Sequence, residues 1–216
     1  EVKEAYVKDL QGLALNNVSV YVCLDGKIIT EAFGEMLFTH FGLSGPIILT
    51  LSKAIVDSLP KGKVEVSIDL KPALSKEKLG LRFLREIKEH GSKNIDNLLK
   101  NLLPQSMIPV FIKLAGISHD KKVHQITQKE RIEIINLLKD MRFTITRHRP
   151  LDEAIVTAGG VSIKEIDPKT MESKIIKNLF ICGEVMDVDA KTGGYNLQAA
   201  FSTGWAAGAA AAICKI

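Results

Sequence analysis

The chain has 216 residues, of which 46% are hydrophobic and 25% charged, and its formal net charge is +4. This length and composition are ordinary for a folded globular protein with a substantial core, in one large domain or two small ones. Lysines occur along the whole length without interleaved aromatic residues, so we expect a solvated lysine-rich surface and no nucleic-acid partner.

The cysteines and the apolar segments indicate a cytoplasmic protein. Cys23, Cys182 and Cys214 form no C-x-x-C motif and cannot all pair; the latter two lie in apolar runs, so we expect buried free thiols. No signal-peptide pattern opens the chain. The apolar stretch over residues 197–213 is shorter than the roughly 20 residues that a membrane span needs, so we expect a core helix and no membrane partner.

Residues 4–70 have a strand-like pattern. Residues 18–22 and 64–68 alternate apolar and polar side chains, and Asp25-Gly26 is a strong hairpin signal. Between these strands, residues 46–59 are typical of a helix, with Pro46 in its first turn and Ser44 as a candidate cap.

Residues 75–141 have a helical pattern. Apolar residues recur at helix spacing up to His90-Gly91, a short helix is expected over residues 95–103, and Thr127 with Glu130 forms a capping box. We therefore expect a first domain over residues 1–145, with a β portion over about 1–70 and a helical portion over about 75–141.

Residues 146–216 combine two short strand candidates, 154–161 and 179–182, with the terminal helix. Two or three strands and one helix cannot cover both faces of a sheet, so this region is expected to be part of a larger α/β domain. A buried strand that ends at Cys182-Gly183 places Glu184 beyond the carboxyl end of a sheet, where open α/β sheets bind ligands.

A glycine pair opens the terminal helix. Gly193 and Gly194 allow the backbone to approach a flat ligand closely, and the amides of Tyr195, Asn196 and Leu197 have no intrahelical partner and carry partial positive charge. The alternative is a tight helix–strand contact with a glycine turn. The carboxylates that precede the glycines favour a site for a flat, partly anionic cofactor.

Two longer segments of the sequence carry a resemblance: "TAGGVSIKEIDPKTMESKIIKNLFICGEVMDVDAKTGGYNLQAAFSTGWAAG", residues 157–208, and "GEMLFTHFGLSGPIIL", residues 34–49. They resemble the HI0933-like family of flavoproteins, which are NAD(P)/FAD-dependent oxidoreductases with two dinucleotide-binding folds. The first segment is similar to the carboxyl-terminal FAD-binding segment of that family, and the second to a segment of its inserted domain. The resemblance implies an α+β inserted domain, antiparallel with a helical subdomain, followed by the carboxyl-terminal part of a Rossmann-like α/β FAD-binding domain over residues 146–216.

The resemblance also implies roles for individual residues. Gly159 and Gly160 would let a strand pass close to the flavin, Glu184 would bind the ribityl chain and Asp187 would support its loop. The helix opening at residues 194–197 would face the pyrimidine edge of the isoalloxazine ring. The implied cofactor-binding residues are Gly159, Gly160, Gly183, Glu184, Asp187, Gly193, Gly194, Tyr195, Asn196 and Leu197.

The glycine-rich G-x-G-x-x-G turn that holds the pyrophosphate of FAD is absent from the sequence. In the family that unit lies at the amino terminus, so we expect a carboxyl-terminal fragment that is inactive alone, does not retain FAD and self-associates through its truncated FAD domain. The alternative is a divergent protein that has lost the FAD half.

The loop "FTHFGLSGP", residues 38–46, offers candidate catalytic residues. A hydrolase with Ser44 as nucleophile and His40 as base is disfavoured, because Pro46 replaces the second glycine of a nucleophile elbow. The resemblance places this loop near the cofactor, so Thr39 and His40 are candidate catalytic residues; the alternative for His40 is a structural hydrogen bond.

No metal site is expected, because His119 and His124 lack thiolates or acids at ligand spacing. The basic residues 147–149 form a candidate phosphate or NAD(P)H contact, or a solvated hinge. The resemblance implies hydride transfer through FAD, from NAD(P)H, to a small organic acceptor. The alternative is a non-catalytic binding module that keeps the flavoprotein shape.

Overall fold

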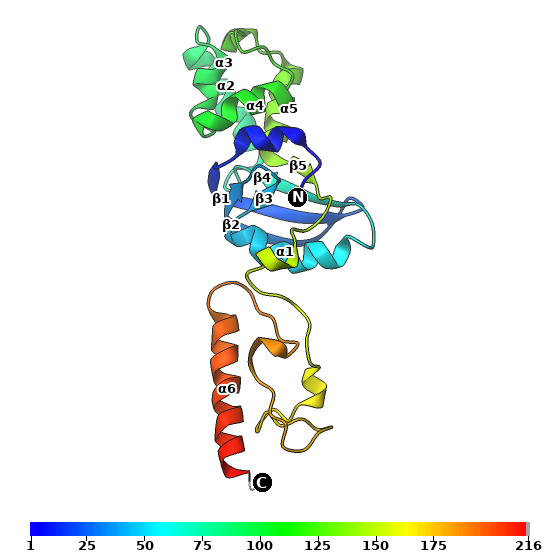
Figure 1. Ribbon diagram of the computed structural model, residues 1–216. Coiled ribbons are helices and arrows are strands. Elements are labelled where there is room, and N and C mark those ends of the chain that lie inside the picture. Colours follow the sequence, from blue (N-terminus) through cyan, green and yellow to red (C-terminus); the bar gives the residue numbers. More distant parts are fainter. Residues whose placement is uncertain (215–216) are drawn as a thin grey trace. The chain divides into compact units, whose positions relative to one another are not determined.

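The computed structural model describes residues 1–214, except the side chain of His90. The chain divides into two compact units, Glu1–His148 and Arg149–Ile216. We call them the sheet unit and the C-terminal unit and describe each by itself (Figure 1). The boundary that the sequence suggests, at residues 145/146, lies three residues before this division.

The sheet unit contains a five-stranded antiparallel sheet in the order β3-β2-β1-β4-β5. Asp25 and Gly26 join the first two strands with φ of 48° and 81°, as in the predicted hairpin turn. The strands are β1 (Ala14–Leu24), β2 (Lys27–Phe38), β3 (Leu43–Ser44), β4 (Val64–Asp69) and β5 (Met141–Thr144). The predicted antiparallel β portion is confirmed, and β5 extends it with residues that follow the helical portion.

Helix α1 (Pro46–Ser58) packs on β1 and β2. Pro46 occupies its first turn as predicted, but the predicted Ser44 cap is wrong, because the N-cap is Gly45 with φ of 93° and no side-chain cap bond. A Cβ on Gly45 would lie 2.8 Å from backbone atoms of Met36 and Leu37. The helix therefore begins too close to β2 for a residue with a side chain.

The helical portion lies between β4 and β5 in the sequence. It contains α2 (Lys76–His90), α3 (Ile95–Leu99), α4 (Ile108–Leu114) and α5 (Gln128–Lys139). The predicted capping box is confirmed: the N–H of Glu130 donates to Thr127 Oγ1 at 3.2 Å, and the N–H of Thr127 donates to the Glu130 carboxylate at 2.8 Å. The helix expected over residues 95–103 ends early, at Leu99, and α4 was not expected.

Three-residue and six-residue 3-10 turns complete the sheet unit: η1 (Ala5–Leu10), η2 (Gln105–Met107) and η3 (Val123–Gln125). One hydrophobic core joins the sheet, α1 and the helical portion, and the largest side chains in it are Phe38, Phe83, Phe111 and Phe143. The Phe143 ring lies 5.7 Å from the rings of both Tyr6 and Phe38. The sheet unit thus has its own complete core.

The C-terminal unit has little regular structure besides one long helix. It contains the turns η4 (Leu151–Glu153), η5 (Ile163–Glu165) and η6 (Gly183–Val185) and the helix α6 (Tyr195–Ile213). Residues 154–161 and 179–182 form no strand, only isolated bridges such as the parallel one between Val161 and Met186, so those strand predictions are wrong for the described chain. A strand needs a neighbouring backbone along its length, whereas each of these segments forms one isolated bridge, Val161 with Met186 and Phe180 with Glu172.

Helix α6 is exposed, contrary to the predicted core helix. Ala207 is its one buried residue, whereas Phe201 and Trp205 expose 70% and 78% of their surface. The small core of this unit consists of Ile166, Met171, Met186 and Ala207. Cys23 is buried as an interior thiol, but the predicted burial of Cys182 and Cys214 is only partial, because this core is too small to enclose them. Among the helices of residues 1–214, none has the length and apolar character that crossing a membrane requires.

Candidate functional site

The candidate site is built from three segments of the C-terminal unit: residues 159–161, residues 183–188 and the start of α6. The N–H of Val161 donates to the carbonyl of Val185 at 2.8 Å, and the N–H of Asp187 donates to the carbonyl of Val161 at 2.9 Å. These two bonds hold the glycine pair 159–160 beside the loop that carries Glu184. Three predicted site residues, Gly160, Glu184 and Asp187, therefore belong to neighbouring segments.

Gly160 has a steric role in this pairing. Its φ is 143°, and an added Cβ would lie 2.4 Å from the carbonyl oxygen of Val185 and 3.0 Å from the carbonyl carbon of Met186. Those atoms are backbone, so they cannot move aside cheaply. Gly159, with φ of 100°, has no atom within 4 Å of the same position. The close approach thus requires glycine at 160, whereas at 159 only the backbone conformation favours it.

Thr203 fixes the loop at Gly183 to helix α6. The N–H of Gly183, whose φ is 74°, donates to Thr203 Oγ1 at 3.0 Å, and that hydroxyl donates to the carbonyl of Ala199 at 2.7 Å. Thr203 is not among the site residues that the sequence predicts. The available signal was a hydroxyl in the middle of a helix that otherwise consists largely of small apolar residues.

Asn196 holds the loop that precedes α6. Its Oδ1 accepts a hydrogen bond from the N–H of Ala190 at 2.8 Å, and its Nδ2 donates to the carbonyl of Ala190 at 3.0 Å. Gly194 is the N-cap in the left-handed conformation, with φ of 89°, and the first helical bond runs from the N–H of Gln198 to its carbonyl. Within the described part of the chain, the amides of residues 195–197 donate to no acceptor, which leaves partial positive charge there.

A small depression joins the loop to the helix. Its lining residues are Gly183, Glu184, Met186, Val188, Asn196, Ala199, Ala200 and Thr203. Glu184 and Asp187 are exposed, as are Gly193, Tyr195 and Leu197. The site therefore combines a carboxylate, which accepts hydrogen bonds from hydroxyls, with unpartnered amides, which favour an electron-rich edge.

The two candidate catalytic residues lie in the sheet unit, in the loop between β2 and β3. The N–H and the hydroxyl of Thr39 both donate to the carbonyl of Gly42, at 2.8 and 3.1 Å, so this side chain closes its own turn. His40 is exposed, and its ring meets the Phe41 ring edge-on at 5.0 Å. Thr39 and His40 belong to the sheet unit, whereas the predicted cofactor-binding residues belong to the C-terminal unit.

The basic residues at 147–149 are engaged within the protein. Arg147 Nε donates to the Glu1 carboxylate at 2.6 Å, and Arg149 pairs with Glu153 four residues later. These contacts favour a structural role over phosphate binding. The described side chains, which exclude that of His90, contain no group of three or more His, Cys, Asp or Glu residues that could hold a metal ion.

Comparisons with known proteins place this chain in a family. A family model described as "HI0933-like protein barrel and H2TH domain" matches residues 1–156. The chain is 34% identical over 202 residues to the ribosomal RNA dihydrouridine synthase of Escherichia coli and 31% identical over 201 residues to the protein of that name from Haemophilus influenzae. It is 30% identical over 197 residues to the 3-dehydro-bile acid delta(4,6)-reductase of Clostridium scindens.

These matches cover 89–93% of this chain but only 46–48% of each relative, so the chain spans about half the length of the curated relatives it matches. They extend from the sheet unit well into the C-terminal unit. Because the family model alone covers more than half of the 216 residues, the chain belongs to the HI0933-like family.

Proposed function

We propose that this chain belongs to an FAD-dependent oxidoreductase that reduces a carbon–carbon double bond with hydride passed from NAD(P)H through the flavin. The observation that supports the proposal is the type of reaction that the names of the relatives describe. The relatives' names, a delta(4,6)-reductase and a dihydrouridine synthase, both describe the addition of hydrogen to a double bond. The substrates differ, so the reaction class is what the relatives share.

The residues of the candidate site fit a flavin. The unpartnered amides at the start of α6 suit the pyrimidine edge, where reduction of the ring places negative charge. Gly159 and Gly194 have positive φ and no atom within 4 Å of the position that a Cβ would take, so both leave space beside the backbone for a flat ring. Glu184 would accept hydrogen bonds from the ribityl hydroxyls. FAD supplies hydride transfer; the chain's own residues bind and orient it.

The same geometry assigns supporting roles to other residues. Gly160 allows the loop 183–187 to pair with Val161, Thr203 holds Gly183, and Asn196 holds the loop before α6. The parallel bridge between Val161 and Met186 supports the proposal that this unit forms part of a Rossmann-like FAD-binding domain, since such domains are built from parallel pairs.

The test is Gly194→Val in the complete gene product that carries this chain. A β-branched residue resists φ of 89° and would occupy the space proposed for the ring, so the purified variant should lose its yellow colour while keeping most of its fold. The matched control is Gly116→Val in the sheet unit, because Gly116 also has positive φ (68°) and open space at its Cβ position. Stoichiometric FAD in the Gly194 variant would contradict the proposed contact.

A second measurement separates an enzyme from a non-catalytic module. The FAD-loaded gene product should bleach anaerobically when NADH or NADPH is added, because hydride from the nicotinamide reduces the flavin. A protein that binds FAD stoichiometrically but is reduced by neither nucleotide would favour the binding module.

A further inference from the structure

The net positive charge of the chain is concentrated in the helical portion. Residues 76–139 contain 13 lysines and arginines but seven aspartates and glutamates, whereas the rest of the chain contains 16 basic and 18 acidic residues. The even spread of lysines in the sequence hides this difference, because acidic residues balance them elsewhere. The helical portion is therefore a basic subdomain, whereas the rest of the chain has a slight excess of acidic residues.

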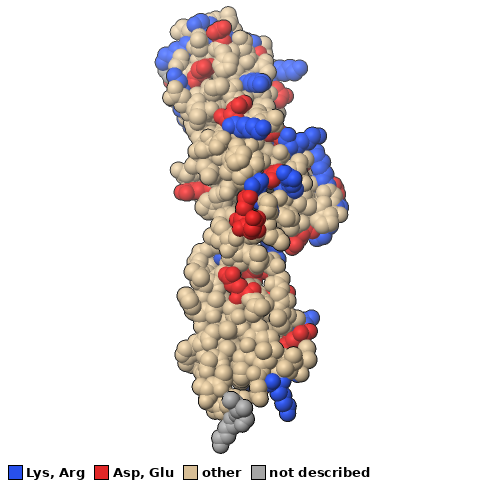
Figure 2. Space-filling view, viewed as in Figure 1, with Lys and Arg blue, Asp and Glu red and all other residues tan. Residues whose placement is uncertain are grey.

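Most of these cations are available to a ligand. Lys121 pairs with Glu130, and Lys139 pairs with Asp69. Among the described residues of this portion, nine exposed cations have no ion pair: Lys76, Lys78, Arg85, Lys88, Lys93, Lys100, Lys113, Lys122 and Lys129. On the face shown in Figure 2, blue lysine and arginine side chains are scattered over this portion with red acidic side chains among them.

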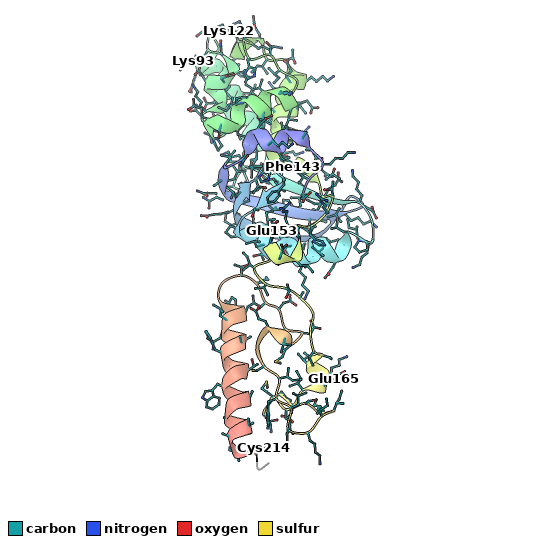
Figure 3. All side chains as sticks on the ribbon, viewed as in Figure 1. Lys93, Lys122, Phe143, Glu153, Glu165 and Cys214 are labelled. Atoms are coloured by element: carbon teal, nitrogen blue, oxygen red, sulfur yellow. The ribbon has the colours of Figure 1, made fainter. Side chains whose placement is uncertain are left out.

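Two of the basic side chains lie on a rigid pair of loops at one end of the helical portion. We define the loop pair as residues 91–95 and 121–124. The N–H of Val123 donates to the carbonyl of Lys93 at 3.0 Å, and the N–H of Ile95 donates to the carbonyl of Lys121 at 3.1 Å. Lys93 and Lys122, one from each loop, lie at the same end in Figure 3.

Further contacts stiffen the loop pair. Lys122 Nζ donates to Asn94 Oδ1 at 2.8 Å, which leaves two of its three N–H donors for a ligand. His124 Nδ1 lies 2.6 Å from the carbonyl of Gly91. Lys88 stands in the last turn of α2, directly before the first loop. Because hydrogen bonds already join the backbones of both loops, binding would have to order the lysine side chains and not the loops themselves.

We propose that the helical portion is an RNA-docking surface, with Lys88, Lys93 and Lys122 at the loop pair contacting the phosphate backbone. The inference deepens the proposed function by naming RNA as the molecule that carries the reduced double bond, and it rests on that function for the reaction only. Two relatives are named for their action on ribosomal RNA. A bile acid is a small ligand and requires no extended basic surface, whereas RNA binding draws most of its affinity from phosphate contacts.

The test measures binding of the chain to a fluorescein-labelled ribosomal RNA hairpin by fluorescence anisotropy at several KCl concentrations. The triple variant Lys88→Gln, Lys93→Gln, Lys122→Gln should weaken binding about tenfold or more at about 50 mM salt. It should also lower the slope of log Kd against log salt by about two to three, since each lost phosphate contact contributes about 0.7–0.9. Unchanged thermal unfolding would show that the variant is folded.

The matched control removes three exposed lysines outside the helical portion, Lys27→Gln, Lys61→Gln and Lys169→Gln, so both variants lose the same charge. It should change Kd less than about twofold. Equal weakening by both triples, or no binding at low salt, would overturn the proposal. So would loop-pair-dependent binding to phosphatidylserine vesicles in place of RNA. The measurement needs no flavin, so RNA binding can fail while the FAD and NAD(P)H tests succeed, and the reverse.

Discussion

The two units of this chain use their apolar residues differently. In the sheet unit, 36 buried residues of the described chain form one continuous core. In the C-terminal unit the buried core has four residues, while large apolar side chains such as Ile155, Phe201 and Trp205 expose 70% or more of their surface. Both regions are rich in apolar residues, so composition alone does not predict which one buries them.

The exposed residues of α6 follow a helical stripe. Leu197, Phe201 and Trp205 stand four residues apart and expose 59%, 70% and 78% of their surface. Contiguous exposed apolar surface of this kind marks an interface. The sheet unit is therefore stabilised by its own packing, and we propose that the C-terminal unit depends on contacts with other protein surfaces and with the cofactor.

The largest expected effect concerns FAD itself. The chain has no glycine-rich turn for the pyrophosphate, so several contacts worth about 1–3 kcal/mol each would be missing together. Since about 1.4 kcal/mol is a factor of ten, affinity should fall by many orders of magnitude and the 216-residue chain should be colourless after FAD addition and desalting. A stoichiometric flavin absorption band would show that the C-terminal unit is a complete site.

Next in size is the contrast between a core aromatic residue of the sheet unit and an exposed one of the C-terminal unit. Phe143→Ala should lower the free energy of unfolding of the sheet unit by about 3–5 kcal/mol, because Phe143 is fully buried against Tyr6 and Phe38. Trp205→Ala should change it by about 0.5 kcal/mol or less. Urea unfolding followed by circular dichroism measures both.

Trp205 also allows a test of whether the exposed residues of α6 mediate self-association. If the stripe on α6 mediates self-association, sedimentation velocity should show dimers of the chain that Trp205→Glu converts to monomers. A wild-type chain that sediments as a monomer at high concentration would contradict that proposal.

A smaller, local effect is expected from alanine substitutions at two adjacent glycines, Gly159 and Gly160. Gly160→Ala should disrupt the pairing of Val161 with the 183–187 loop by about 1–3 kcal/mol, because its Cβ would meet backbone atoms. Hydrogen exchange of the Val161 amide should then accelerate about tenfold or more. Gly159→Ala has open space and should have a clearly smaller effect. Equal effects would mean that backbone conformation, not the close contact, sets the need for glycine.

The smallest expected effect lies at the capping box of α5. The hydrogen bond from Lys121, and those from Thr127, hold the pKa of Glu130 below its usual value. A lowered folded-state pKa stabilises the protein above the unfolded pKa of about 4.3, and this contribution is lost as the pH falls through the folded pKa.

Glu130→Gln should therefore lower the free energy of unfolding by about 0.5–1 kcal/mol at neutral pH, and the difference should shrink below about pH 4.3. Urea unfolding at several pH values measures it, with the exposed Glu133→Gln on the same helix as control. A difference that persists unchanged at low pH would exclude the charge of Glu130 as its cause.

Local signals in the sequence predicted much of the sheet unit. The Asp25-Gly26 turn, Pro46 at the start of α1 and the Thr127–Glu130 box depend on neighbours within four residues, and all three are confirmed. The prediction of Ser44 as the N-cap was wrong because the N-cap is Gly45. Residue 45 must be glycine there, since the backbone of β2 lies 2.8 Å from the position that its Cβ would take. The sequence around residue 45 does not reveal how closely β2 approaches it.

The candidate site was less predictable for the same reason. Its glycines and carboxylates stand out in the sequence, but the partners of Thr203 and Asn196 lie in loops six to 20 residues away. The strand candidates 154–161 and 179–182 have the right composition and lack the neighbouring backbone that a strand needs. The basic character of the helical portion is readable from the sequence, but only when the acidic residues of 76–139 are counted together with the lysines and arginines.

The contact of His124 with Gly91 also determines where that ring carries its proton. A carbonyl oxygen only accepts, so Nδ1 must donate across the 2.6 Å, and the neutral imidazole is held in the Nδ1–H tautomer with a lone pair on Nε2. The lysines of the loop pair can only donate, whereas Nε2 in this tautomer would be an acceptor suited to a ribose 2′-hydroxyl, the group that distinguishes RNA from DNA. Nitrogen-15 chemical shifts of the His124 ring would reveal the tautomer, and His124→Phe should narrow any preference for RNA over DNA.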